Sequence, residues 1–173
     1  MFKKFIPFAT AKNIYEIDTN FFIKNNIKTI LCDLDNTLDP YDEIVPRKEA
    51  HDLVKKLKEV GIEFIIFSNN KEKRVKPYAD SLGIKYYLKI AKPLKYKAEK
   101  IFKKINLNKD ETLIIGDQLL TDILFSNKVK IKGVFCDKLG IRDFWWTRLM
   151  RGPEKIIKNY LSKHNLLIDY KEL

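Results

Sequence analysis

Apolar and polar residues alternate with two different periods along most of this chain. Short apolar runs, of the length of buried strands, lie at residues 27–33, 62–67, 86–90, 112–116 and 131–136. Between these runs, apolar residues recur every three or four positions, which is the spacing of one face of a helix. Strands that alternate with helices in this way predict a parallel sheet with helices on both of its faces.

The helical spacing predicts helices at residues 19–26, 47–60, 71–82, 94–105 and 119–127. Gly61 and Gly83 end two of these helices, because glycine adopts the left-handed conformation that closes a helix. Pro77 should kink the third helix. Near the end of the chain, Gly152 stops one predicted helix and Pro153 starts another.

These elements predict an α/β protein with a Rossmann-like fold. We expect an open parallel sheet of five strands in the order 3-2-1-4-5, numbered along the chain, with helices on both faces. The fourth strand then separates the first from the fifth. Cys32 and Cys136 would lie about 9–10 Å apart, which is too far for a disulfide. The length of 173 residues suits one domain, and we assign residues 1–173 to it.

The charge of the chain favours an anionic partner. Lys and Arg number 34 against 23 acidic residues, a net charge of +11. This excess suggests contact with nucleic acid, an acidic membrane surface or a phosphorylated substrate. Only five of the basic residues are arginine, the residue best suited to bidentate recognition of bases and phosphates, which argues against nucleic acid. The lysine excess is equally typical of an AT-rich genome.

The sequence predicts a cytoplasmic protein. Its apolar runs fall far short of the ~20 residues of a membrane-spanning helix. The apolar start of the chain is too short for a signal peptide and is interrupted by Pro7. Both cysteines lie in apolar runs and are expected to be reduced core residues.

Polar residues follow the first four predicted strands. The segments are DLDNTL at 33–38, SNN at 68–70, KP at 92–93 and GDQLLTD at 116–122. Because the carboxyl ends of parallel strands meet at one edge of the sheet, we expect these segments to converge there. A carboxylate cluster needs a cation, and hard oxygen ligands suit Mg²⁺. One carboxylate can attack phosphorus as a nucleophile, and a second can transfer the proton of the leaving group or of water.

In these four motifs the sequence resembles the haloacid dehalogenase (HAD) superfamily of phosphotransferases. The resemblance implies that Asp33 is the nucleophile and a metal ligand, and that Asp35 is the general acid and base. The backbone carbonyl of Asp35 would also reach the metal. Asp117 is implied to be a metal ligand. Asp122 is implied to be a second acid of the same motif, which lies either near the metal or next to the residues that bind it. The implied cofactor is Mg²⁺.

Three more residues are implied to contact the phosphate. Ser68 and Lys92 would hold the transferring phosphoryl group, with Lys92 also offsetting the charge of the carboxylates. Asn69 would contribute its amide to the phosphate or to the leaving group. We therefore predict a phosphatase that hydrolyses phosphoric monoesters.

A closer resemblance covers about residues 20–151. The sequence is similar to the YqeG family of HAD IIIA-type phosphatases in the stretches SNNKEKRVKPYADSLGI, KPL and GDQLLTDI, in the strand ILCD and in the pair Thr147-Arg148. Relatives in that family dephosphorylate phosphatidylglycerophosphate, a lipid precursor. The resemblance thus implies a phosphate carried on a phospholipid headgroup.

The spacing of the motifs leaves no room for a cap domain. The interval 33–68 holds a short loop, one helix and a strand, and the interval 68–92 holds one helix and a short strand. An open site admits a phosphate mounted on a large body, such as a lipid in a bilayer, a protein or a nucleic-acid end. A homo-oligomer in which a second subunit acts as the cap is left open.

A basic and aromatic helical segment is expected at about 141–163. Trp145 and Trp146 lie there beside three of the five arginines. Aromatic residues next to basic ones are typical of a helix at an anionic membrane, which would place the protein peripherally at the inner face of the membrane. Alternatively, these aromatic residues pack on the sheet together with the apolar stripe of Ile156, Ile157, Tyr160 and Leu161.

Three functions follow from the sequence. The first is a Mg²⁺-dependent phosphatase that acts on a phospholipid headgroup through an aspartyl-phosphate intermediate. The second is a capless phosphatase for protein, nucleic-acid or nucleotide phosphate. The third is a binding protein with the HAD fold and no turnover, against which the intact pair of Asp33 and Asp35 argues.

Overall fold

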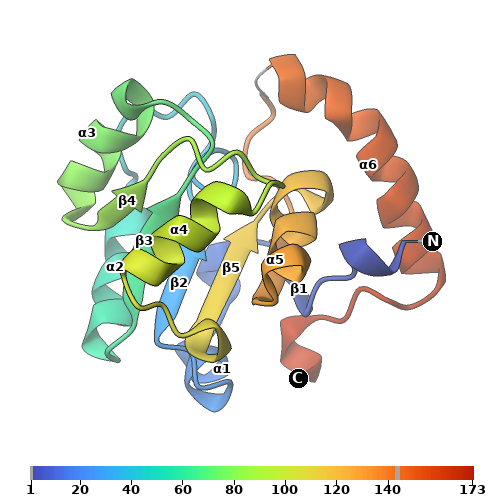
Figure 1. The fold of residues 1–173 in the computed structure, drawn as a ribbon, viewed down its shortest axis with the longest axis horizontal. Helices are drawn as coiled ribbons and strands as arrows, with labels where there is room; N and C mark the ends of the chain where they lie inside the picture. The colour runs from blue at the N-terminus through green and yellow to red at the C-terminus, as the bar shows by residue number, and fades with distance from the viewer. Residues whose placement is uncertain (1, 143–144) are drawn as a thin grey trace.

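Six parallel strands form the open sheet at the centre of the protein, in the order β1-β6-β5-β2-β3-β4 (Figure 1). The computed structural model describes the backbone of residues 2–142 and 145–173, and the side chains of residues 2–142 and 149–173. The strands are β1 (Ala9–Ala11), β2 (Thr29–Cys32), β3 (Glu63–Phe67), β4 (Lys85–Tyr87), β5 (Thr112–Gly116) and β6 (Lys132–Cys136).

The prediction of five strands was wrong by one. The five predicted strands have the predicted order, since 3-2-1-4-5 corresponds to β4-β3-β2-β5-β6. The sixth strand, β1, pairs with β6 at the edge of the sheet, with Ala9 opposite Val134. A three-residue strand is too short to show the pattern from which strands are predicted. Strand β4 also ends earlier than predicted, because Lys89 and Ala91 have φ angles of 50° and 65°, outside the extended conformation.

The α-helices follow the predicted ranges closely through residue 129. They are α1 (Thr19–Lys24), α2 (Lys48–Glu59), α3 (Glu72–Leu82), α4 (Tyr96–Lys104), α5 (Leu124–Val129) and α6 (Trp145–Lys163). A π-helical turn, η4 (Leu119–Ile123), leads into α5. The remaining helical turns are η1 (Lys3–Phe5), η2 (Ile14–Glu16), η3 (Lys109–Glu111) and η5 (Tyr170–Glu172). Asp18 caps α1 through the Asn20 N–H, and Gly83 closes α3 in the left-handed conformation.

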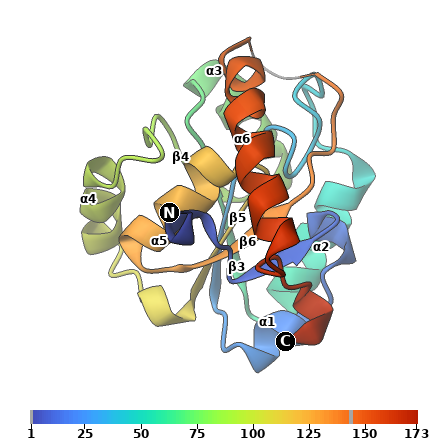
Figure 2. The same ribbon diagram turned by 90° about the vertical axis from the view of Figure 1, so that its right-hand side faces the viewer.

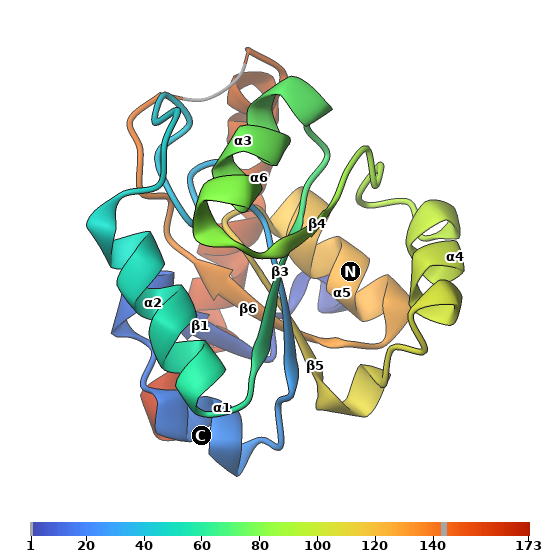
Figure 3. The ribbon, with the colours of Figure 1, turned by 90° about the vertical axis from the view of Figure 1, so that its left-hand side faces the viewer.

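Helices cover both faces of the sheet. Helices α1, α2 and α3 pack on one face, and α4 and α5 pack on the other (Figure 3). In the central strand β2, Ile30 and Cys32 face the first layer and Leu31 faces the second, and all three are fully buried. This cover on both faces fixes the strand ends, where the polar loops begin.

Both cysteines are free and buried. Cys32 lies on β2 and Cys136 on β6, and β5 runs between these two strands. The prediction that one strand separates these two cysteines is confirmed.

The helix α6 contradicts the predicted break at Gly152 and Pro153. It continues through both residues and packs against η4 near the β6 side of the sheet (Figure 2). Ile157 and Leu161 are buried in a cluster with Leu119 and Phe135. This packing offsets the roughly 3 kcal/mol that a proline costs inside a helix.

The apolar stripe of α6 is divided between core and solvent. Ile157 and Leu161 pack in the core, as the alternative of packing on the sheet predicted. Ile156 does not follow that prediction, since it is 66% exposed. The side chains of Trp145 and Trp146, which the membrane alternative invokes, lie outside the described residues. In the described part of the chain, no helix combines the length and the apolar character needed to cross a bilayer.

Candidate active site

The loops after β2, β4 and β5 meet at one edge of the sheet, as predicted from the strand order. Lys92, in the loop after β4, connects the other two. Its Nζ atom lies 2.8 Å from Oδ1 of Asp33, which follows β2, and 2.6 Å from Oδ1 of Asp122, which lies in η4. All three side chains are buried. The edge therefore brings a nucleophile candidate and a cation into direct contact.

Burial and crowding shift the pKa values of these groups. Burial raises the pKa of Asp33 to about 8; Lys92 opposes the rise, and the neighbouring carboxylates add to it. Burial works against a charge on Lys92, but Asp122 and Asp33 outweigh it and raise the pKa of the ammonium group. Lys92 therefore stays cationic. Its single positive charge does not balance the negative charges of the carboxylates around it.

Asp35 is held by a separate pair of residues. Nδ2 of Asn70 donates to its Oδ2 at 2.8 Å, and Nε of Arg74 donates to its Oδ1 at 3.0 Å. The Asp35 side chain is 18% exposed, so it reaches solvent from a fixed orientation. Such a placement suits a group that exchanges protons with a leaving group and with water. We did not assign roles to Asn70 and Arg74 from the sequence, because only the fold brings them to Asp35.

The guanidinium group of Arg74 is incompletely satisfied. Among the described residues, its Nη1 and Nη2 atoms are buried without a hydrogen-bond partner, although Nη2 lies 3.0 Å from Oδ1 of Asp35 as an ion pair. Buried donors without partners are costly. Arg74 is thus held beside Asp35 by charge more than by complete hydrogen bonding.

Ser68 and Asn69 shape the loop after β3. Ser68 is buried, and its Oγ accepts a hydrogen bond from the Asn70 N–H at 3.0 Å. The amide of Asn69 accepts from the Lys92 N–H at 2.8 Å and donates to the Lys92 carbonyl at 3.0 Å. In this structure Asn69 therefore positions the backbone of Lys92. Contact of Ser68, Asn69 and Lys92 with phosphate stays a prediction.

The loop after β5 presents the last two predicted acids. Oδ2 of Asp117 lies 2.5 Å from Nη2 of Arg151, and its Oδ1 accepts from the Thr37 hydroxyl at 3.3 Å. Burial raises the pKa of Asp117 to about 7, against the lowering effect of Arg151. Gly116 is required here, because an added Cβ would lie 2.2 Å from the Asp122 carboxyl carbon.

The donor set at this edge fits a divalent cation. Five carboxylates and three cationic side chains lie here, which gives a formal charge of −2. The carboxylates are Asp33, Asp35, Asp117, Asp122 and Glu154, and the cations are Lys92, Arg74 and Arg151. Carboxylate oxygens are the hard ligands that Mg²⁺ prefers. Within the described residues, no three acidic, histidine or cysteine side chains form a ready-made metal site. The four predicted ligands thus fit Mg²⁺ by charge and chemistry and stay predictions.

A buried aspartate shapes the turn after the nucleophile. Asp39 is fully buried and accepts hydrogen bonds from the Arg47 side chain, from the Arg47 N–H and from the Tyr78 hydroxyl. Burial and this hydrogen bond raise the pKa of Tyr78, so its hydroxyl remains a donor. Asp39 therefore ties the turn after Asp33 to the start of α2 and to α3.

Asp39→Ala should lower the free energy of unfolding by about 3 kcal/mol, because it leaves the Tyr78 hydroxyl and the Arg47 guanidinium without their acceptor. Urea unfolding followed by circular dichroism measures the change. Asp42→Ala is the control, since Asp42 pairs with Arg142 at 3.8 Å at an exposed position and should contribute less than about 1 kcal/mol. Equal losses in the two variants would contradict this role of Asp39.

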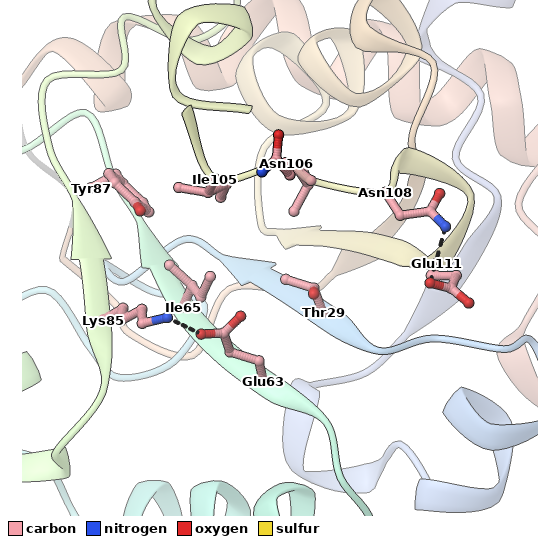
Figure 4. A pocket seen from close by; sticks show the side chains of 10 residues that line it. Thr29, Glu63, Ile65, Lys85, Tyr87, Ile105, Asn106, Asn108 and Glu111 are labelled. Atoms are coloured by element: carbon pink, nitrogen blue, oxygen red, sulfur yellow. Dashed lines mark hydrogen bonds and ion pairs between the residues drawn. The ribbon is translucent and has the colours of Figure 1, made fainter. Parts of the chain in front are cut away.

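A hollow of about 270 Å³ lies away from this edge (Figure 4). It is lined by the first residues of three strands, Thr29, Glu63 and Lys85, and by Glu111 just before β5. These residues mark the amino ends of the strands, whereas ligands of open parallel sheets bind beyond the carboxyl ends. The hollow is therefore separate from the carboxylate edge.

The fold and this edge define a class of hydrolases. A family model described as haloacid dehalogenase-like hydrolase matches residues 39–129. This chain belongs to the haloacid dehalogenase-like hydrolase family and is a phosphatase of that family. It is 34% identical over 164 residues to the protein named "Probable phosphatase YqeG" of Bacillus subtilis (strain 168), an alignment that covers 94% of this chain and 95% of that protein.

Solved structures share the fold. An uncharacterized protein from Listeria monocytogenes serotype 4b matches with a TM-score of 0.56 and 21% identity, over 69% of this chain and 84% of that one. The cobalt-bound deoxy-D-mannose-octulosonate 8-phosphate phosphatase of Haemophilus influenzae matches with a TM-score of 0.51 and 16% identity, over 66% and 80% of the two chains. These similarities establish the fold alone. The predicted HAD fold is confirmed, and no domain is inserted in the described stretch 33–92.

Proposed function

We propose that this phosphatase hydrolyses phosphoric monoesters with Mg²⁺ through an aspartyl-phosphate formed on Asp33. The observation that carries the proposal is the contact of the buried Asp33 carboxylate with Nζ of Lys92 at 2.8 Å, at the carboxyl end of β2. A carboxylate beside a fixed cation can attack phosphorus while the cation offsets charge on the phosphoryl oxygens. Phosphate release tests the proposal.

The reaction proceeds in two displacements. A carboxylate oxygen of Asp33 attacks phosphorus, the bond from phosphorus to the ester oxygen breaks, and Asp35 donates a proton to that oxygen. Asp35 then takes a proton from water, whose oxygen attacks phosphorus and displaces Asp33 as a free carboxylate. Mg²⁺ held by Asp33, Asp117 and the Asp35 carbonyl, with Asp122 beside them, would balance the negative charge of the site.

We further propose that the phosphate is carried on a phospholipid headgroup, as in phosphatidylglycerophosphate. Large apolar side chains stand exposed on the loops beside the site, with Ile44 at 77%, Val45 at 66% and Ile141 at 97% exposure. The loops 40–46 and 138–142 lie side by side (Figures 2 and 3), and the Leu139 N–H donates to the Asn36 carbonyl at 2.8 Å. Exposed apolar residues around an open site favour contact with a lipid surface.

Replacing these three side chains should slow hydrolysis of a lipid substrate selectively. We expect the triple variant Ile44→Ser, Val45→Ser, Ile141→Ser to release phosphate from phosphatidylglycerophosphate in anionic vesicles more slowly by about tenfold or more, because it removes apolar side chains whose insertion into the lipid surface favours membrane binding. Hydrolysis of p-nitrophenyl phosphate should change by less than about twofold, since the carboxylates are untouched. Ile23→Ser on α1, 54% exposed, is the control.

Each outcome of this experiment distinguishes the candidate functions. If the unmodified protein hydrolyses soluble phosphoesters and leaves the lipid intact, that result would favour a phosphatase for protein, nucleic-acid or nucleotide phosphate. Equal losses on both substrates in the triple variant would contradict a membrane role for these side chains. Absence of any hydrolysis would favour a binding protein with the HAD fold.

A further inference from the structure

The C-terminal helix α6 contacts the loop that carries Asp117 through two charged side chains. Arg151 places Nη2 at 2.5 Å from Oδ2 of Asp117 and Nη1 at 3.2 Å from the Asp117 carbonyl oxygen. The same Nη1 atom lies 2.8 Å from Oε2 of Glu154, which lies three residues further along the helix. Arg151 therefore holds both the side chain and the main chain of Asp117, and Glu154 holds Arg151.

Glu154 also contacts the backbone of the loop. Its side chain is buried, and Oε1 accepts hydrogen bonds from the Leu119 N–H and, at 3.4 Å, from the Leu120 N–H. These two groups open η4, where Gln118 provides no side-chain cap. The first N–H groups of a helical turn have no partner within it. A carboxylate from α6 thus supplies the cap that the loop lacks.

Arg151 and Thr37 contact different oxygens of the Asp117 carboxylate. Arg151 occupies Oδ2, while Oδ1 has the Thr37 hydroxyl at 3.3 Å as its neighbour. Carboxylates that ligate metals are commonly oriented by hydrogen bonds to the oxygen that does not bind the metal. Arg151, which lies outside the four motifs, is thus placed where a residue that orients a metal-binding carboxylate would lie.

We propose that Arg151 and Glu154 are positioning residues that hold Asp117 and the turn at Leu119 in the geometry that binds the metal. The proposal rests on the proposed function, because it takes Asp117 as a metal ligand. It makes α6 a part of the active site as well as a cover for the core.

Mn²⁺ binding to the full chain, measured by electron paramagnetic resonance, tests the role of Arg151. Arg151→Met should raise the Kd for Mn²⁺ by about 10- to 100-fold, the usual cost of losing a group that orients a metal ligand. Arg151→Lys should restore part of the affinity, and Lys155→Met, at an exposed position on the same helix, should leave it unchanged. Unchanged Mn²⁺ affinity in Arg151→Met would overturn the proposal. Tighter binding would overturn it too, and would show that Arg151 competes with the cation.

Hydrogen exchange of the metal-free protein tests Glu154 independently of metal binding. Glu154→Leu should speed exchange of the Leu119 and Leu120 amides by about tenfold or more, because it removes their acceptor. Glu154→Gln, which keeps an acceptor oxygen, should speed exchange less, and the Phe135 amide in β6 serves as the internal control. Unchanged exchange at Leu119 would refute the proposal. If the unmodified protein binds no Mn²⁺, the proposed Mg²⁺ chemistry and the metal role of the pair both fail, even where exchange shows that α6 caps the loop.

Discussion

Asp33→Asn should abolish phosphate release and leave the fold intact. The amide cannot attack phosphorus, and it removes one anionic ligand from the proposed metal site, so we expect kcat to fall by at least about a thousandfold. The fold should survive, because asparagine has nearly the size of aspartate and Lys92 keeps the Asp122 carboxylate as its partner at 2.6 Å.

Phosphate release from p-nitrophenyl phosphate and thermal unfolding measure the two parts of this prediction. Asp52→Asn makes the same chemical change at an exposed position on α2 and should keep full activity. Turnover near the unmodified rate in Asp33→Asn would rule out the aspartyl-phosphate route. Loss of folding together with activity would leave Asp35→Asn as the variant that tests the catalytic pair, since Asp35 is partly exposed.

Lys92→Met should remove activity and also destabilise the protein. The Lys92 ammonium lies between the carboxylates of Asp33 and Asp122, and all three groups are buried. Removing one partner of a buried ion pair typically costs about 3–5 kcal/mol, because the remaining charge has no partner. We expect a loss of that size in the free energy of unfolding, and phosphate release reduced by about a thousandfold or more.

Urea unfolding with and without Mg²⁺ identifies the cause of this loss. Mg²⁺ should restore part of the stability of Lys92→Met, because a divalent cation at the carboxylates replaces the missing charge. Lys95→Met, an exposed change in the same loop, should have little effect on either measurement. A loss below about 1 kcal/mol in Lys92→Met would show that the carboxylates are protonated or solvated without this lysine.

The strand order and the edge of the site were predictable from local pattern. Asp33 and Ser68 directly follow apolar runs that became β2 and β3, and Asp117 follows β5. Because parallel strands end at a common edge, the order of the motifs was enough to predict that the segments of Asp33 and Lys92 converge there. The roles at these positions came from the resemblance to the HAD superfamily.

The remaining features depend on contacts between segments distant in the chain. Arg151 reaches Asp117 across 34 residues, and Arg74 reaches Asp35 across 39. The helix α6 passes through Pro153 because buried packing outweighs an intrinsic preference, and β1 forms because β6 offers it a partner. Periodicity and turn preferences report on neighbours along the chain. The contacts of Arg151 and Glu154 on α6 with the loop after β5 depend on which surfaces meet in the folded chain, and no local pattern records that.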